Sequence, residues 1–138
     1  MKILFMCVAN SARSQMAEGL AKKLFGADAQ IESAGSSPKS VNPFAIKVMS
    51  EIGIDLAGHY SKLCEKLDPA FLVDLDFVIT LCAEEVCPVI PSSKARKLHW
   101  AFSDPAGHLG TDDQQLSRFR DVRDKIHDRL KMFKSDLM

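Results

Sequence analysis

Near its start the chain reads Ile3-Leu4-Phe5-Met6-Cys7-Val8-Ala9-Asn10-Ser11-Ala12-Arg13-Ser14. The apolar run predicts a buried strand, the polar residues after Cys7 predict a tight loop, and the residues from Ser14 onward predict a helix. A loop that enters a helix turns its free backbone N–H groups toward one point, where the helix dipole adds positive potential. We therefore expect residues 8–14 to form a cradle for a tetrahedral oxyanion.

The two chemical groups of this loop are a thiol and a guanidinium. Cys7 would face the loop amides and Arg13, and this positive surrounding favours the nucleophilic thiolate. Arg13 offers a planar fork that can hold two oxygens of the anion, and the Ser14 hydroxyl could cap backbone amides of the helix or donate to the sulfur. Asn10 tolerates a left-handed backbone and could pin the loop from within. The alternative is a buried cysteine after a strand and a surface arginine after a turn.

The rest of the chain alternates apolar runs with helical periodicity. Strands are predicted at residues 30–34, 76–81 and 97–101, and helices at 14–25, 43–53, 65–74 and 112–133. This alternation predicts one α/β domain over residues 1–138, a small doubly wound, four-stranded parallel sheet with helices on both faces. In such sheets ligands bind at the carboxyl ends of the strands, where Cys7 and Cys82 fall.

Composition excludes several classes of function. Lys plus Arg and Asp plus Glu each number 18, so no net field favours nucleic acid or an acidic membrane surface. No apolar run approaches the roughly 18 residues of a membrane-spanning helix. The apolar start is too short for a signal peptide, so we expect a cytoplasmic protein.

The four cysteines fit reactive thiols better than static disulfides, because cytoplasmic thiols are kept reduced. They are not spaced as paired zinc-binding units. Cys82 ends a predicted strand and Cys87 follows five residues later, a spacing at which a disulfide would disturb one helical turn and could act as a redox switch. The alternative is two unrelated buried thiols. Cys64 lies beside leucines and is predicted to pack in the core.

A carboxylate completes the set of candidate catalytic groups. Asp104, which precedes Pro105, follows the last predicted strand and could protonate a leaving oxygen as a general acid. Alone, an Asp-Pro pair more often opens a turn. The nucleophile predicted at Cys7 favours the catalytic interpretation.

Taken together, these residues resemble the thioredoxin-coupled arsenate reductases, which share their fold with the low-molecular-weight protein tyrosine phosphatases. The resemblance covers nearly the whole chain and includes the Cys7–Ser14 loop, Ser33-Ala34-Gly35, Val41-Asn42-Pro43, Gly53-Ile54-Asp55, Cys82, Cys87-Pro88 and His99-Trp100-Ala101-Phe102-Ser103-Asp104.

The resemblance implies a relay of three cysteines. Cys7 would attack arsenate held by Arg13, with Asp104 assisting the departing oxygen. Cys82 would then attack the adduct and release arsenite, and Cys87 would move the oxidation outward to a Cys82–Cys87 disulfide that thioredoxin reduces. We expect a monomer, with phosphate and sulfate as competing anions.

The chain departs from the family's pattern near this loop. Ala9 stands where glycine is typical, which requires a backbone compatible with a Cβ, and Ala12 stands where cysteine is common. Some relatives hold a potassium ion with residues matching Asn10, Glu18 and Ser33 and with an acidic residue where Lys62 stands here. We expect the Lys62 ammonium to reach Glu18 and replace that ion; the alternative is a solvated lysine.

Two other functions stay open on the sequence. A low-molecular-weight tyrosine phosphatase needs only Cys7, Arg13 and Asp104, with water resolving the intermediate. It would also need aromatic walls for the substrate ring, and no aromatic residue follows Asp104-Pro105 directly. A non-catalytic oxyanion-binding or redox-sensing module would tolerate the loss of Asp104.

Overall fold

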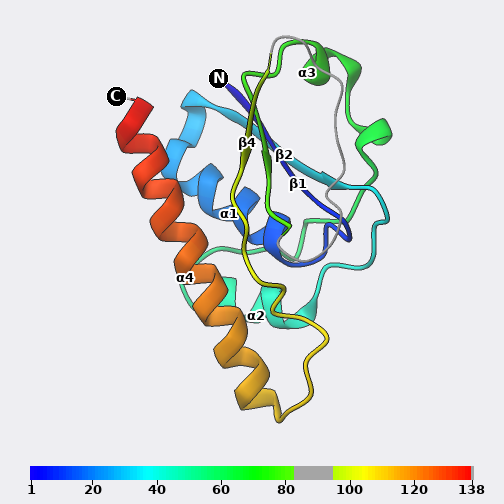
Figure 1. Cartoon of the computed structure of the whole chain (residues 1–138), viewed down its shortest axis with the longest axis vertical. Coiled ribbons are helices and arrows are strands. Elements are labelled where there is room, and N and C mark those ends of the chain that lie inside the picture. Colours follow the sequence, from blue (N-terminus) through cyan, green and yellow to red (C-terminus); the bar gives the residue numbers. More distant parts are fainter. Residues whose placement is uncertain (83–94, 138) are drawn as a thin grey trace.

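The computed structural model describes residues 1–82 and 95–137 as a four-stranded sheet with helices against it (Figure 1). Cys87 therefore lies outside the described residues. The elements are β1 (Lys2–Cys7), α1 (Arg13–Phe25), η1 (Gly26–Asp28), β2 (Gln30–Gly35), α2 (Pro43–Ser50), η2 (Cys64–Lys66), α3 (Pro69–Val73), β3 (Phe77–Thr80), β4 (Arg96–His99) and α4 (Asp112–Leu137).

The sheet has the strand order β2-β1-β3-β4, and every strand pair is parallel. After β1 the chain forms β2 on one side of this strand, and it then crosses over to form β3 and β4 on the other side. The topological switch point of the sheet therefore lies at the carboxyl end of β1. Cys7 pairs with Gly35 at this rim, and Met6 pairs with Thr80. The predicted α/β fold class is confirmed, and it places Cys7 where ligands bind in such folds.

The two faces of the sheet carry separate apolar clusters, because side chains alternate along each strand. Ile3 and Phe5 of β1 point toward α1, α2 and α4, whereas Leu4 and Met6 point toward α3 and the segment around Leu67. Helices thus cover both faces. The larger cluster packs α1 against the sheet, and with it the end of the candidate oxyanion loop that leads into this helix.

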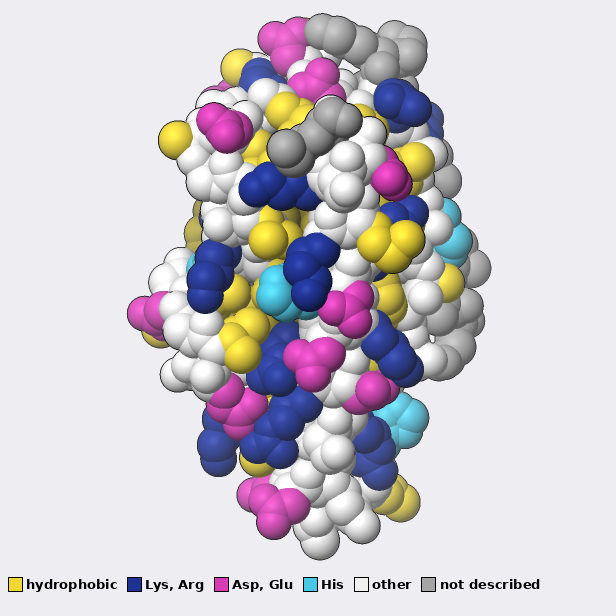
Figure 2. All heavy atoms as spheres, turned by 90° about the vertical axis from the view of Figure 1, so that its left-hand side faces the viewer, with side chains coloured by type: hydrophobic (Ala, Val, Ile, Leu, Met, Phe, Trp, Pro, Cys, Tyr) yellow, Lys and Arg dark blue, Asp and Glu magenta, His cyan; other side chains and the backbone are white. Residues whose placement is uncertain are grey.

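The helices differ from their predicted bounds: α1 begins at Arg13 rather than at residue 14, and α2 ends at Ser50 rather than at residue 53. The prediction of a helix over residues 65–74 is wrong in its first half, because α3 begins only at Pro69, where the Asp68 side chain accepts from the Ala70 N–H. Cys64 instead lies in the 3₁₀ turn η2. The last helix, α4, continues to Leu137. On the side of the molecule that carries α4, basic and acidic side chains are interspersed (Figure 2).

A charged cluster joins α2 to α4. The Glu51 carboxylate accepts from Arg120 Nη2 at 2.7 Å and from Arg123 Nη1 at 3.0 Å, and Arg123 also donates to the Val48 carbonyl. The hydrogen bonds from Arg120, ahead of those from Arg123, lower the pKa of Glu51 to about 2. The ionised Glu51 carboxylate therefore stabilises the packing of α2 against α4.

We predict that Glu51→Gln lowers the melting temperature, and that the loss depends on pH. The pKa of Glu51 is about 2 in the folded protein and 4.5 as the ordinary value, so its stabilisation is complete above pH 4.5 and is lost as pH falls toward 2. Thermal denaturation from pH 7 to pH 3 should show the gap between wild type and variant narrowing, with Glu65→Gln as a control on an exposed glutamate. A gap that stays constant with pH would contradict this role.

Candidate active site

Cys7 ends β1 with its side chain turned into the loop that precedes α1. Its sulfur lies 2.9 Å from the Ser14 hydroxyl, and the residue is only 2% exposed. The N-cap residue of α1, Ala12, makes no side-chain capping bond, and the first turn contains no acidic residue. The helix N–H groups therefore stay available to an anion beside the thiol.

Asn10 holds this loop in shape. Its φ of 47° is the one positive value among the non-glycine residues that the structure describes. Its side-chain amide donates to Ser14 Oγ at 2.8 Å and Ser33 Oγ at 3.0 Å, and its Oδ1 accepts from the Lys62 N–H at 3.0 Å. A left-handed residue costs about 1–2 kcal/mol, and each net hydrogen bond contributes about 0.5–1.5 kcal/mol, so the three bonds together offset a cost of this size.

The loop backbone accommodates the alanine at position 9. Because Asn10 alone among the described non-glycine residues has a positive φ, Ala9 adopts a conformation that any side chain tolerates. The glycine that the site does require is Gly35, at which a Cβ would come within 2.4 Å of the Val8 carbonyl oxygen. Strand β2 can approach the loop only without a side chain there.

A second segment of chain braces the loop from outside. The N–H groups of Ser37, Lys39 and Asn42 donate to the carbonyls of Val8, Ala9 and Ser11, each at 2.9 Å. These bonds turn the loop carbonyls outward and leave its N–H groups for the pocket. The sequence contains no signal for this bracing, because backbone hydrogen bonds do not depend on side-chain identity.

Arg13 and Asp104 face each other across the pocket. Arg13 Nη1 donates to the Phe102 carbonyl at 2.9 Å, and Nη2 lies 3.7 Å from Asp104 Oδ2. The Asp104 Oδ1 accepts from the Ala106 N–H, which fixes the turn after β4. Together with Cys7 they line a pocket of about 410 Å³. The carboxylate, 40% exposed, stands where it can meet a ligand oxygen.

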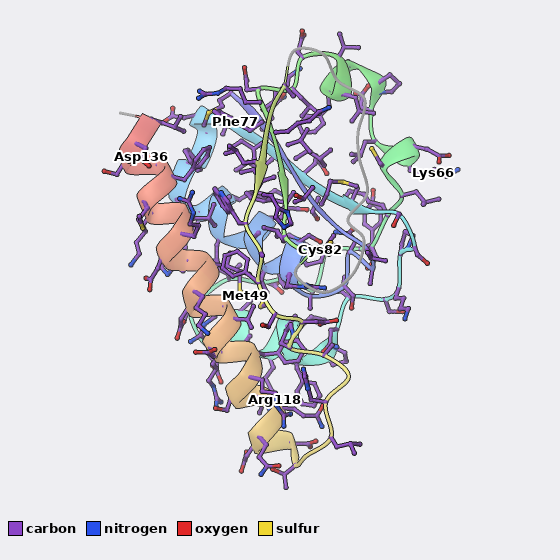
Figure 3. All side chains as sticks on the ribbon, viewed as in Figure 1. Met49, Lys66, Phe77, Cys82, Arg118 and Asp136 are labelled. Atoms are coloured by element: carbon purple, nitrogen blue, oxygen red, sulfur yellow. The ribbon has the colours of Figure 1, made fainter. Side chains whose placement is uncertain are left out.

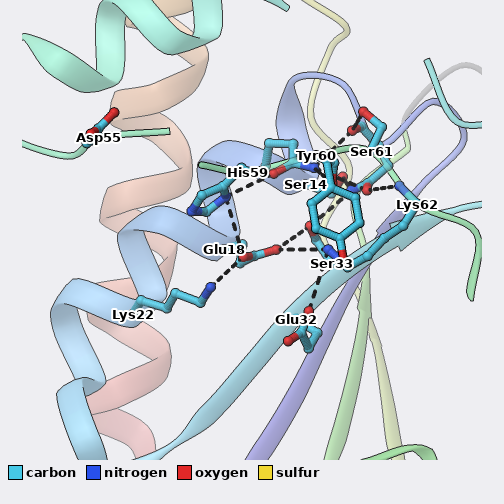
Figure 4. A network of polar contacts seen from close by, with 12 residues as sticks. Ser14, Glu18, Lys22, Glu32, Ser33, Asp55, His59, Tyr60, Ser61 and Lys62 are labelled. Atoms are coloured by element: carbon cyan, nitrogen blue, oxygen red, sulfur yellow. Dashed lines mark hydrogen bonds and ion pairs between the residues drawn. The ribbon is translucent and has the colours of Figure 1, made fainter. Parts of the chain in front are cut away.

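Beneath the loop lies a buried carboxylate, Glu18, surrounded by donors (Figure 4). Lys22 Nζ lies at 2.6 Å, the Ser33 hydroxyl donates at 2.5 Å, and Lys62 Nζ lies 3.8 Å from Oε1 and 3.5 Å from Glu32 Oε2. Burial alone would raise the pKa of Glu18, but the bonds from Lys22 and Ser33 and the charge of Lys62 outweigh it and hold the pKa below 4.5.

The residues predicted as a cation site or its substitute are thus brought together. Asn10 bonds to Ser33, Ser33 bonds to Glu18, and the Lys62 ammonium, 9% exposed, lies between Glu18 and Glu32. In the part of the chain that the structure describes, no cluster of His, Cys, Asp and Glu is arranged to hold a metal ion. The alternative of a solvated lysine does not fit this burial.

Two residues of this site gave no signal in the sequence. Gln15 is fully buried and donates to the Asn10 carbonyl and to the Tyr60 carbonyl, while its Oε1 contacts His59 Nδ1 at 3.1 Å. His59 also lies 3.4 Å from Glu18; burial, ahead of the neighbouring charges, lowers its pKa below 6.5. Their roles depend on contacts with residues more than 40 positions away.

Cys82 follows β3 at the same rim as Cys7, since the Leu81 N–H donates to the Met6 carbonyl (Figure 3). It is 2% exposed and disulfide-bonded, whereas Cys7 and Cys64 are free thiols. Cys64 packs against the apolar cluster beneath α3, as predicted, and burial, ahead of the charge of Glu65, raises the pKa of its thiol.

Residues 2–138 match the family described as low molecular weight phosphotyrosine protein phosphatase. The chain therefore belongs to this family.

No helix in the described ranges 1–82 and 95–137 is long and apolar enough to cross a membrane.

Two relatives show to which group within the family the chain belongs. It is 47% identical to the arsenate reductase of Halalkalibacterium halodurans over 133 residues, 95% of this chain and 93% of that one. The arsenate reductase of Bacillus subtilis is 43% identical over the same shares of the two chains. Within the family, the chain belongs with the arsenate reductases.

Solved structures agree in fold. An arsenate reductase in its oxidised state superposes with a TM-score of 0.81 at 33% identity, and one in a phosphate-binding state with 0.80 at 34%; each comparison covers 99% of this chain and 98% of the other. A thioredoxin-dependent arsenate reductase of Corynebacterium glutamicum is 27% identical, with a TM-score of 0.68 over 98% of this chain and 62% of that one.

Proposed function

We propose that this enzyme reduces arsenate to arsenite through three thiols, with electrons from thioredoxin. The observation that carries the proposal is the placement of Cys7 and Cys82 after neighbouring strands at one rim, beside a pocket lined by Arg13 and Asp104. A phosphatase has no chemical need for the second thiol. The proposed enzyme acts as a monomer in the cytoplasm.

The first step uses the oxyanion loop. The Cys7 thiolate, hydrogen-bonded by Ser14, attacks arsenic while the loop N–H groups and Arg13 hold the other oxygens. One arsenic–oxygen bond breaks, and Asp104 supplies the proton with which that oxygen leaves as water. Arsenic stays pentavalent in the adduct.

The second step reduces the arsenic. The Cys82 thiolate attacks the Cys7 sulfur, a disulfide forms, and the sulfur–arsenic bond breaks with its electron pair left on arsenic. Trivalent arsenite departs. Cys87 then attacks Cys82, Cys7 leaves as a thiolate, and the resulting Cys82–Cys87 disulfide is reduced by the two thiols of thioredoxin. The role of Cys87 rests on the family resemblance.

The comparisons support this assignment. One similar structure is an arsenate reductase in a phosphate-binding state, and another is thioredoxin-dependent. Phosphate shares the shape and charge of arsenate, so phosphate and sulfate should compete for the loop. Tyrosine phosphatase activity is less well supported, because no aromatic side chain lines the pocket among the described residues.

We predict that Cys7→Ser, Cys82→Ser and Cys87→Ser each abolish multiple turnover of arsenate with thioredoxin, thioredoxin reductase and NADPH. Cys64→Ser, which removes a thiol of the apolar cluster, is the matched control and should retain activity. Hydrolysis of a small aryl phosphate should vanish only in Cys7→Ser, because it needs no resolving thiol. Sustained arsenate turnover by Cys82→Ser or Cys87→Ser would contradict the relay.

The proposed enzyme also carries its own cation in place of potassium. The Lys62 ammonium lies within 4 Å of both Glu18 and Glu32, and its backbone N–H bonds to Asn10. It therefore neutralises the buried carboxylate and braces the oxyanion loop at once.

Exchanging sodium for potassium at equal ionic strength should leave the melting temperature and activity of the wild type unchanged. Lys62→Gln should lower the melting temperature by about 4 °C or more, because Glu18 loses a cation, while Lys66→Gln on the exposed 3₁₀ turn should not. A strong potassium-specific gain in the wild type would rule out the replacement.

A further inference from the structure

The oxyanion pocket contains one charged residue, Lys39, that has no part in the proposed relay. Among residues 1–82 and 95–137, the charged side chains that line the pocket are Arg13, Asp104 and Lys39. Arg13 and Asp104 oppose each other at 3.7 Å, so their fields largely cancel at the mouth. As long as Asp104 is still ionised, this pair and the Cys7 thiolate together carry one net negative charge, which repels an approaching oxyanion.

Lys39 is fixed at the rim by its own backbone. Its N–H donates to the Ala9 carbonyl at 2.9 Å, and Pro38 restricts the chain directly before it. The residue is exposed, and among residues 1–82 and 95–137 its ammonium has no ion-pair or hydrogen-bond partner. The bracing segment thus brings an uncommitted positive charge to the mouth of the pocket.

We propose that Lys39 is an anion-binding residue of this pocket, which captures the oxyanion by charge before Arg13 and the loop amides hold it. The identity of the oxyanion as arsenate rests on the proposed function, but the electrostatic role does not. Since Lys39 acts on capture and not on the attacking sulfur, it should set KM and leave kcat nearly constant.

Two measurements test this role. In arsenate reduction, Lys39→Gln should raise KM about three- to tenfold at low salt, with the effect shrinking as salt screens the charge. Without any turnover, the anionic reagent iodoacetate should alkylate Cys7 about three- to tenfold more slowly relative to neutral iodoacetamide in Lys39→Gln than in the wild type. Mass spectrometry of the peptide that contains Cys7 reports both rates.

The controls separate charge from structure. Lys39→Arg should keep the wild-type ratio of iodoacetate to iodoacetamide rates, and Lys47→Gln, an exposed lysine on α2 outside the pocket lining, should not change it. An unchanged ratio and an unchanged KM in Lys39→Gln would overturn the proposal. A changed ratio in a protein that fails to reduce arsenate would uphold Lys39 and reject the proposed function.

Discussion

The left-handed backbone of Asn10 is the constraint on which the active site depends. With φ at 47°, the chain reverses tightly enough between β1 and α1 for the loop N–H groups to converge beside Cys7. The strain is held by side-chain bonds to Ser14 and Ser33 and by the backbone of Lys62. Ser14 is shared between Asn10 and the Cys7 sulfur, so the shape of the loop and the state of the nucleophile are linked.

The same constraint explains why charge is buried beneath the loop. Ser33 holds Asn10 and also donates to Glu18, and a buried carboxylate is costly unless cations face it. Lys22 and Lys62 supply them. On the pocket side of the loop, the backbone amides, Arg13 and Lys39 create a positive potential that favours an anion, and the Asp104 carboxylate reduces this potential. The loop therefore separates a cluster whose charges are neutralised internally from a pocket that can accept an anion.

Much of this could be predicted from sequence, because it depends on local patterns. The strands, the helix after Arg13, the left-handed Asn10 and the approach of Lys62 to Glu18 follow from periodicity, residue type or family resemblance. The bracing bonds of residues 37–42 and the contacts of Gln15 could not, because they join segments distant in sequence. The start of α3 differs from the predicted range, although Asp68-Pro69 is a local start signal in which Asp68 caps the helix and proline occupies its first turn.

The central claim is that Cys82 resolves an adduct formed on Cys7. It is tested most directly by treating the fully reduced Cys87→Ser protein with one equivalent of arsenate and no thioredoxin. The relay predicts one arsenite released per chain and a Cys7–Cys82 disulfide, identified by peptide mass spectrometry. Release of arsenite with Cys7 and Cys82 unlinked, or no release of arsenite at all, would contradict it.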